Sequence, residues 1–244
     1  CSCAEIVAAL YFYKMKVDPK NPKWEDRDRF LLSKGHAALV QYAALAELGF
    51  FPREELKSVK ALGAMLQGHP DMNRTPGVEA VTGSLGQGLS IANGMALGLR
   101  LDGKRNRVYV IIGDGELAEG QIWEAVMAAA NFKVDNLTAI VDRNRIQATG
   151  WVKDRFDTNP IAPKWAAFGW HVIKIDGHNV EQILKAFEKA ERTKGKPTVI
   201  IAETVKGKGV SFAENTAAFH NGIMNAELYE TAKKDLDTMQ VGGE

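Results

Sequence analysis

A strand, a helix and a second strand follow one another between residues 107 and 150, and this unit limits the possible folds more than any other stretch. Residues 108–112 are apolar and mostly β-branched, which predicts a buried strand that ends at Gly113. Apolar residues recur at helical spacing over residues 117–132, and residues 137–141 predict a second buried strand. A β-α-β unit places its strands in parallel. We therefore expect an α/β fold with a mostly parallel sheet and helices on both faces.

Two polar side chains follow these strands. Asp114 comes after the first strand and Asn144 after the second, which places both at the carboxyl edge of the sheet, where ligands bind in open α/β folds. The segment GDGELA also fits the dinucleotide fingerprint, but a carboxylate between the glycines repels a pyrophosphate unless a cation separates them. The pair therefore indicates a hard divalent ion such as Mg²⁺, bound through oxygens and shared with phosphates. A helix cap at Asp114 and an Asx-turn at Asn144 explain an isolated pair equally well.

The other regular elements are predicted by the same periodicities. Helices are expected over residues 4–13, 36–48, 53–60, 89–101, 180–193 and 226–236, and strands over residues 171–175 and 198–204, which extend the sheet. The glycine- and lysine-rich loop over residues 206–222 is a candidate lid. Neither internal repeats nor a low-complexity linker divide the sequence. One domain over residues 1–244 is therefore the expectation.

The GDG motif, a spacer of about thirty residues and an asparagine resemble the cofactor signature of thiamine-diphosphate enzymes. Within that group the chain is similar to transketolase. The similarity covers nearly the whole chain through KVDPKNPKWEDRDRFLLSKGHAA, LGAMLQGHPD, TPGVEAVTGSLGQGLSIANGMALG, GDGELAEGQIWEA and VKGKGVSFAENTAAFHNG. It matches the first third of a full-length transketolase, or the N-terminal subunit of an enzyme split into two polypeptides. The resemblance implies the diphosphate-type thiamine-diphosphate-binding fold.

The resemblance also implies a set of residues that hold the cofactor. Asp114, Asn144 and the backbone oxygen of Ile146 would bind Mg²⁺, with Ca²⁺ or Mn²⁺ as alternatives, and thereby the diphosphate of thiamine diphosphate. The other implied cofactor-binding positions lie in loops: His36, Gly83, Ser84, Leu85, Gly115, Glu116 and His220. The family more often has proline where this chain has Ser84, which is a mild change because the implied contacts there are mainly to the backbone.

Three histidines lie in the segments that carry the resemblance, and it implies a catalytic role for each. His36 would lie against the diphosphate, His69 would bond the hydroxyls of the donor sugar, and His220 would lie at the mouth of the site. From the sequence pattern alone, a capping histidine and a turn histidine are the alternatives for His36 and His69. We assign His171 and His178 to structure, and none of the five histidines shows the H-x-x-x-H or H-E-x-x-H spacing of a metal site.

The family's catalytic glutamate lies on a pyrimidine-binding domain that we expect to be absent from this chain, together with the C-terminal domain. Glu119 matches a carboxylate at the subunit interface instead. We therefore expect the partner to be a C-terminal transketolase subunit, with self-association of this chain to a dimer and an α2β2 assembly. The sequence begins without methionine and lacks the Gly-His-Pro-Gly segment of the family, so we expect either a processed or shortened chain or a numbering that begins inside the natural protein.

The implied activity is transfer of a two-carbon ketol unit from a ketose phosphate to an aldose phosphate, as in the pentose phosphate pathway, and it would be weak or absent without the partner. The alternatives are a transketolase-like enzyme for an unusual sugar and a 2-oxo acid dehydrogenase α subunit, but the Ser-Lys-Gly-His-Ala and Gly-His-Pro segments argue against the second. An NAD-dependent oxidoreductase is disfavoured by Asp114 and by the lack of an acidic strand end about 20 positions past the glycines. A non-catalytic cofactor-binding subunit stays open.

Charge and composition bear on partners and location. The chain has 31 Lys and Arg against 30 Asp and Glu, and no basic cluster is long enough to follow a nucleic-acid backbone. It has neither a secretory segment nor an apolar run of about 18 residues. Cys1 and Cys3 are too close in sequence to form a useful disulfide. We expect a cytoplasmic protein that binds neither nucleic acid nor membrane.

Overall fold

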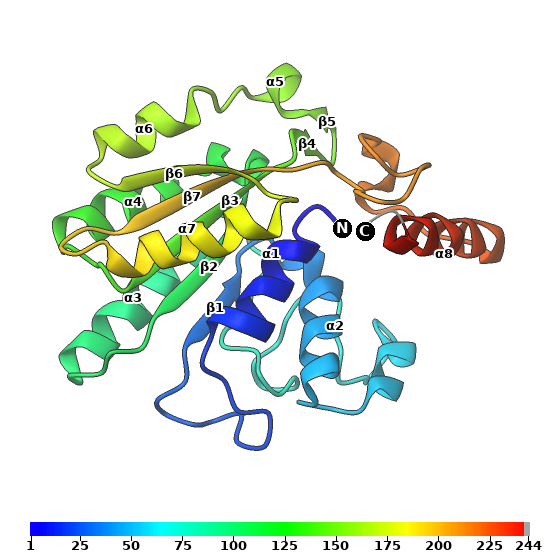
Figure 1. Cartoon of the computed structure of the whole chain (residues 1–244), viewed down its shortest axis with the longest axis horizontal. Coiled ribbons are helices and arrows are strands. Elements are labelled where there is room, and N and C mark those ends of the chain that lie inside the picture. The colour runs from blue at the N-terminus through cyan, green and yellow to red at the C-terminus, as the bar shows by residue number, and fades with distance from the viewer. Residues whose placement is uncertain (242–244) are drawn as a thin grey trace.

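The structure, a computed structural model, describes residues 1–241 and is built around one parallel sheet (Figure 1). The sheet has five strands in the order β1-β2-β3-β7-β6, and each neighbouring pair is parallel. The strands span Arg29–Leu32 (β1), Val108–Gly113 (β2), Leu137–Arg143 (β3), Thr198–Glu203 (β7) and His171–Asp176 (β6). The predicted parallel sheet is confirmed, and its five carboxyl ends meet at one edge.

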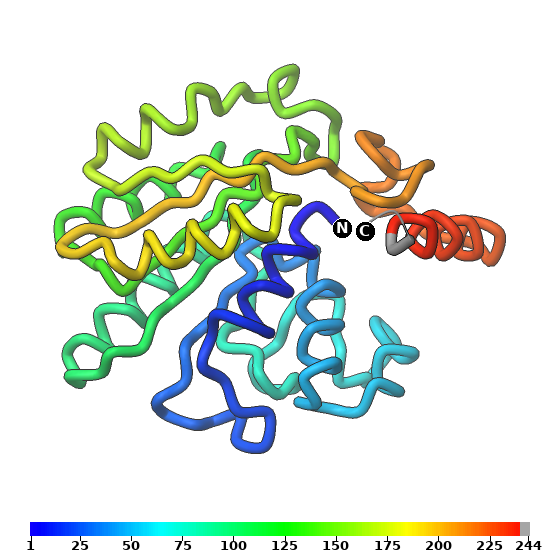
Figure 2. The backbone as a smooth tube through the Cα atoms, in the orientation of Figure 1, coloured from blue at the N-terminus to red at the C-terminus, as the bar shows by residue number. Residues whose placement is uncertain are grey.

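Helices cover both faces of this sheet, as predicted. On one face α1 (Ala4–Ala9), which continues as a π-helical turn, packs against α2 (Ala38–Leu48) and α7 (Val180–Arg192). On the other face α3 (Gln87–Leu101) packs against α4 (Gly120–Asn131), and α6 (Ile161–Ala167) packs on β6. Figure 2 traces these layers along the chain.

Each face has its own apolar core, and the side chains of the strands alternate between the two. Ile111, Ile140 and Ile200 belong to the core under α1 and α7. Val110 and Val141 belong to the core under α3 and α4. All six residues of β2 are buried, because a parallel strand covered on both faces is apolar throughout. Burial of each such side chain stabilises the fold by about 1.5–3 kcal/mol, so the apolar strands explain the central layer.

Several short elements differ from the sequence-based expectations. The helix expected over residues 53–60 is a 3₁₀ helix at Arg53–Ser58, and the one expected over residues 117–132 begins only at Gly120, after a 3₁₀ turn at Gly115–Ala118. Strand β1, the hairpin of β4 (Ile146–Gln147) and β5 (Gly150–Trp151), and α5 (Val152–Arg155) were not predicted. These segments are too short for a periodicity to identify them.

The last helix, α8 (Ala226–Val241), begins where predicted and extends beyond residue 236. It projects from the side of the molecule in Figure 1. None of the helices within residues 1–241 combines the length and the apolar character that crossing a membrane requires.

One glycine of α3 sets how closely this helix approaches the loop after β1. A Cβ on Gly88 would contact Ser33 Oγ and lie 2.8 Å from Ser33 Cα, whereas a Cβ on Gly94, in the same helix, would meet nothing within 4 Å. We expect Gly88→Ala to lower the free energy of unfolding by about 1–3 kcal/mol through overpacking, and Gly94→Ala to raise it by about 0.5–1 kcal/mol through helix propensity. Urea denaturation followed by circular dichroism measures both, and equal effects of the two substitutions would contradict the close approach at Gly88.

Candidate active site

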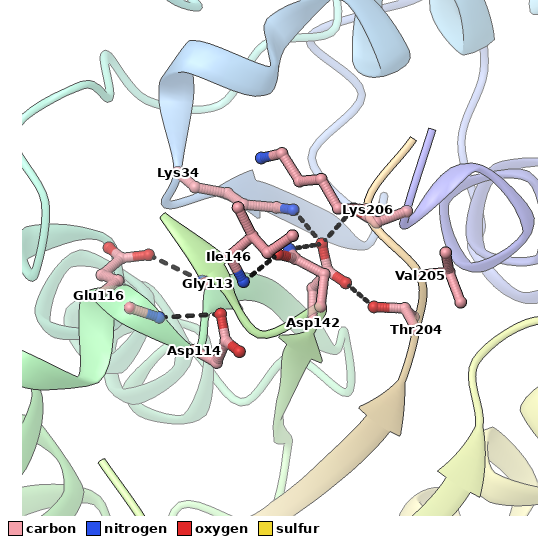
Figure 3. Close-up of polar contacts among 12 residues, drawn as sticks. Lys34, Gly113, Asp114, Glu116, Asp142, Ile146, Thr204, Val205 and Lys206 are labelled. Carbon is pink, nitrogen blue, oxygen red and sulfur yellow. Dashed lines mark hydrogen bonds and ion pairs between the residues drawn. The ribbon is translucent and has the colours of Figure 1, made fainter. Parts of the chain in front are cut away.

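Four loops meet at the carboxyl edge of the sheet, and three of them carry half of the predicted site residues (Figure 3). Residues 33–36 follow β1, residues 114–116 follow β2, residues 144–146 follow β3 and residues 204–206 follow β7. Such an edge is where open α/β sheets bind ligands. The structure therefore brings the predicted Asp114 and Asn144 to neighbouring strand ends.

Asp114 presents a buried carboxylate that has no cationic partner among the described residues. Its side chain is 3% exposed, and its oxygens accept hydrogen bonds from the backbone N–H of Gly115 at 2.9 Å and of Arg145 at 2.6 Å. Burial raises the pKa of Asp114 to about 6, although these hydrogen bonds oppose the shift. A buried carboxylate is costly unless a cation compensates it. This environment suits a bound metal ion.

Asn144 and Ile146 supply the neutral oxygens beside this carboxylate. The Asn144 amide donates to Asp142 Oδ2 at 3.2 Å, and its Oδ1 accepts from the backbone N–H of Ile146 at 3.1 Å. The Asx-turn at Asn144 and the cap at Asp114, both considered as structural alternatives, are therefore present. They fix the orientation of the oxygens and leave each oxygen a further lone pair, so they do not exclude a metal.

The donor chemistry of this group fits Mg²⁺. A carboxylate, an amide oxygen and the backbone oxygen of Ile146 are hard ligands, and Mg²⁺ commonly completes its octahedron with water and phosphate oxygens. No cluster of three or more His, Cys, Asp or Glu side chains within the described part of the chain is suited to hold a metal. An ion at Asp114 would therefore depend on oxygens from a ligand. Asp114 also lines a cleft of about 360 Å³ that it shares with Arg145 and Trp151.

A buried ion pair, which the sequence analysis did not identify, ties three of the four loops together. Asp142, at 0% exposure near the end of β3, pairs with Lys34 Nζ and accepts hydrogen bonds from Thr204 Oγ1 and from Ser2 Oγ, the latter at 2.6 Å. Burial alone would raise the pKa of Asp142, but the Lys34 charge and these hydrogen bonds lower it to about 2. The pair therefore stays ionised and holds the loops after β1 and β7 against β3.

Glu116, predicted as a cofactor-binding residue, uses its side chain to join loops inside the protein. It is 3% exposed and accepts hydrogen bonds from Ser33 Oγ, from the backbone N–H of Gly86 at 2.9 Å and from that of Gly113 at 3.0 Å. Burial is the main cause of its raised pKa. The carboxylate is therefore committed to the protein, and we retain Glu116 and Gly115 as cofactor candidates only through their backbone.

The structure brings the three predicted catalytic histidines together. The rings of His36 and His220 stack with centroids 4.9 Å apart at an angle of 27°. His69 lies near enough to His36 to lower the pKa of that ring, and it packs on Gly83, where a Cβ would lie 2.9 Å from the His69 ring. The φ of +148° at Gly83 also favours glycine. His36, His69 and His220, from three predicted site segments, thus lie near one another.

Burial, together with the charges of Lys34 and Lys206, lowers the pKa of both stacked histidines to about 4. Both rings are therefore neutral near pH 7, and each has one nitrogen that donates and one that accepts. A neutral pair of this kind is suited to hydrogen bonding with ligand oxygens and to moving protons.

The lowered pKa values predict a pH-dependent stability. Between pH 4 and the ordinary histidine pKa of about 6.5, the folded chain holds fewer protons on His36 and His220 than the unfolded chain. Their contribution to the free energy of unfolding is therefore present above pH 6.5 and is lost as the pH falls towards 4. Asp114 acts in the opposite direction between its unfolded value of about 3.9 and about 6, so wild type and variant must be compared. We expect a His36→Gln/His220→Gln variant to lose less stability between pH 7 and 5 in urea titrations, and equal losses would contradict the lowered pKa values.

The remaining predicted positions lie at the periphery of this cluster. Ser84 and Leu85 are exposed, and Ser84 Oγ accepts a hydrogen bond from Gln87 Nε2 at 3.2 Å. Glu119 is exposed at the start of α4, against Gly86, where a Cβ would lie 2.7 Å from Glu119 Cβ. Their roles in cofactor binding and at a subunit interface stay predictions.

The histidines assigned to structure are placed as expected. His178 Nδ1 donates to Glu5 Oε1 at 2.9 Å, and its Nε2 accepts from the backbone N–H of Val205 at 2.9 Å, which ties α1 to the end of β7. His171 begins β6.

Three charged residues at the site were missed by sequence reasoning: Lys34, Asp142 and Lys206. Each follows or ends an apolar strand, so a charge at the end of a buried strand was the available signal. Lys206 Nζ lies 2.9 Å from His220 Nδ1, which connects the loop after β7 to the histidine cluster.

Comparison with known proteins identifies one family. Residues 1–239 match the family described as "Transketolase, thiamine diphosphate binding domain". The 6-deoxy-6-sulfo-D-fructose transketolase subunit SqwG of Clostridium sp. (strain MSTE9) is 49% identical over 236 residues, which cover 97% of this chain and 86% of that protein. An apulose-4-phosphate transketolase subunit of Phocaeicola vulgatus is 42% identical, with 96% and 83% covered. The transketolase of Rattus norvegicus is 45% identical, but this chain spans only 37% of it.

Solved structures agree with this assignment. The transketolase of Campylobacter jejuni superposes with a TM-score of 0.89 at 36% identity, covering 97% of this chain and 38% of that chain. The Pichia stipitis transketolase in complex with sedoheptulose-7-phosphate gives a TM-score of 0.87 at 28% identity, with 96% and 39% covered. The chain thus corresponds to somewhat more than a third of these enzymes.

Proposed function

The chain belongs to the transketolase thiamine diphosphate-binding domain family, and on this basis we propose that it is the N-terminal subunit of a two-chain transketolase. The proposed reaction transfers a two-carbon ketol unit from a ketose phosphate to an aldose phosphate. The support comes from relatives that are themselves named as subunits and that this chain spans over 83–86% of their length. The one structural observation that carries the proposal is the buried Asp114 carboxylate, which has no ion-pair partner among residues 1–241 and lies at the edge shared with Asn144.

In this proposal Asp114, Asn144 and the backbone oxygen of Ile146 hold Mg²⁺, and the ion binds the diphosphate of the cofactor. His36 and His220 add neutral hydrogen-bonding groups beside it, and the backbone of the loop at Gly83 holds the aminopyrimidine end. Bound thiamine diphosphate supplies the carbon nucleophile with which the carbon–carbon bond is broken and made. The chain's own part is to bind and orient this group.

His69 is the proposed contact for the hydroxyls of the donor sugar. Its ring packs against Gly83 and lies near enough to His36 to affect the pKa of that ring, so it can donate or accept a hydrogen bond at this place in the site. A sugar other than the common pentose phosphates is a second candidate, because the relatives from Clostridium and Phocaeicola vulgatus are named for the unusual sugars 6-deoxy-6-sulfo-D-fructose and apulose 4-phosphate.

The catalytic glutamate would come from a C-terminal subunit that carries the pyrimidine-binding domain. In the proposed assembly two copies of each chain form an α2β2 heterotetramer in the cytoplasm, with residues 1–244 as one thiamine-diphosphate-binding domain. Glu119 and the exposed Leu85 lie on the surface that would face the other subunits.

Calorimetric titration of the purified chain with thiamine diphosphate tests the cofactor site. We expect binding in Mg²⁺ that is lost in EDTA. Binding that is equal in EDTA, or binding of NAD in place of thiamine diphosphate, would contradict the proposal.

A turnover assay with and without a polypeptide carrying the pyrimidine-binding and C-terminal domains of the family tests the partner. Full turnover by the chain alone would contradict the need for it.

A further inference from the structure

A buried tyrosine of α2 bonds the loop that carries His69. Tyr42 is 0% exposed, and its hydroxyl lies 2.9 Å from the backbone oxygen of Gln67 and 3.0 Å from that of His69. Burial, together with the charge of Asp71, raises the pKa of Tyr42 to about 12, so the hydroxyl keeps its proton and donates at neutral pH. A hydroxyl has one proton, which two carbonyls of the same loop share here. Tyr42 therefore restricts the backbone over residues 67–69.

The loop over residues 61–70 depends on such contacts for its course. It forms neither a helix nor a strand, so its backbone groups need partners from elsewhere. The buried Thr75 donates to the backbone oxygen of Met65 at 3.1 Å. Among the described residues, Tyr42 alone provides a hydrogen bond to the backbone of His69. The place of His69 is therefore set by Tyr42 more than by its own loop.

The same tyrosine connects two of the three clustered histidines. His36 lies in the 3₁₀ turn Gly35–Ala37, and α2 begins at the next residue. Tyr42 is six residues beyond His36, so one rigid helix joins the His36 turn to the loop of His69. The His69 ring is restricted as well, because it packs on Gly83. A site residue is placed precisely when its neighbours fix both its backbone and its ring.

We propose that Tyr42 is a positioning residue for the sugar: its hydroxyl holds His69 at a fixed place relative to His36, where the His69 ring meets the donor hydroxyls. This inference rests on the proposed function, because it takes His69 as the sugar contact. Tyr42 is completely buried, so it acts on the sugar only through His69. Hydrogen bonds weaken steeply with distance and angle, so a displaced ring would bind the donor less well.

A double-mutant cycle on the complete enzyme tests the proposal. The chain is combined with the polypeptide that carries the pyrimidine-binding and C-terminal domains. The donors are fructose 6-phosphate and the sugar for which the Clostridium relative is named, 6-deoxy-6-sulfo-D-fructose. We expect Tyr42→Phe to lower kcat/KM for the donor by about two- to ten-fold, mainly through KM, as loss of one hydrogen bond does. The affinity for Mg²⁺-thiamine diphosphate should not change. In a His69→Ala background, Tyr42→Phe should have no further effect.

The outcomes of this cycle separate the inference from the proposed function. Wild-type kcat/KM in Tyr42→Phe would overturn the inference, and so would an equal loss with and without His69, because a merely structural tyrosine acts independently of His69. Wild-type kcat/KM in His69→Ala would overturn both the sugar contact and the inference and leave the cofactor site intact. Failure of the wild type to turn over either donor would overturn the proposed function as well.

Tyr11→Phe is the matched control. Tyr11 is buried in the same core, and its hydroxyl accepts a hydrogen bond from Gln41 Nε2 at 3.2 Å, so the substitution also removes one buried hydrogen bond. It should keep the wild-type kcat/KM, because Tyr11 does not bond the loop of His69. A loss equal to that of Tyr42→Phe would overturn the inference.

The position of the His69 ring can also be measured without a sugar or a partner. In the full chain with isotopically labelled histidine, the NMR signals of the His69 ring are those that disappear in His69→Ala. We expect Tyr42→Phe to shift these signals and to leave those of His171, which begins β6, in place. Tyr11→Phe should shift neither. Unshifted His69 signals in Tyr42→Phe would overturn the inference.

Discussion

Replacement of Asp114 by alanine is expected to weaken Mg²⁺-dependent binding of thiamine diphosphate by at least about a hundred-fold, because loss of residues that merely support a metal ligand already costs 10–100-fold. Asp114 is the one carboxylate of the proposed oxygen set, and Asn144 and Ile146 offer only neutral oxygens. Calorimetry in Mg²⁺ measures the effect. Asp176→Asn is the matched control, since Asp176 ends β6 at the same edge and is exposed.

The conservative variant Asp114→Asn separates binding from folding. Burial raises the pKa of Asp114, which means that the ionised carboxylate destabilises the free chain at pH 8. Asparagine removes this charge and keeps an oxygen that can accept the backbone N–H of Arg145, but it loses the bond from the backbone N–H of Gly115. Because these two effects oppose one another, we expect the free variant to stay folded with a stability in urea near that of the wild type and yet to bind the cofactor poorly. Wild-type affinity in this variant would rule out Asp114 as the metal ligand.

The sequence predicted the elements of this fold that are long and periodic. Residues 108–112 and 137–141 read as buried strands because both faces of β2 and β3 are covered, and the edge position of Asp114 and Asn144 followed from the parallel order alone. β1 was not predicted, because it has only four residues and because these follow a charged segment. The start of α4 was placed too early because Gly115–Ala118 forms a 3₁₀ turn under the Asp114 cap.

The site residues were predicted from the resemblance to transketolase more than from local sequence patterns. The contacts that were not predicted join residues far apart in the sequence. Lys34 and Asp142 are 108 residues apart, and no local spacing indicates that they pair. Glu116 was predicted to contact the cofactor, but its carboxylate accepts a hydrogen bond from the backbone N–H of Gly86, thirty residues away. That contact depends on how α3 packs. Periodicity reports which face of an element is buried, and it does not report which polar groups meet at the ends of elements.

The buried Lys34–Asp142 pair provides the largest expected change in stability. Lys34→Met leaves the Asp142 carboxylate, at 0% exposure, without its cation, and we expect a loss of about 3–5 kcal/mol in the free energy of unfolding. That is a large part of the roughly 5–15 kcal/mol of a typical domain. Lys185→Met is the control, because Lys185 and Glu181 form an exposed i,i+4 pair of the kind that contributes little to stability. Urea denaturation at pH 7.5 measures both, and similar losses would show that Asp142 does not depend on Lys34.

The double variant Lys34→Met/Asp142→Asn distinguishes stabilisation from positioning. It removes both charges, so no buried charge is left uncompensated, and we expect it to recover most of the stability that Lys34→Met loses. Ser2 and Thr204 would still bond the asparagine, but the ion pair by which Lys34 holds the loop after β1 to β3 would be gone. His36 lies in that loop, so cofactor affinity should stay reduced although the fold is restored. Recovery of both stability and affinity would show that the ion pair is dispensable for the site, whereas recovery of stability alone assigns it to alignment of the diphosphate loops.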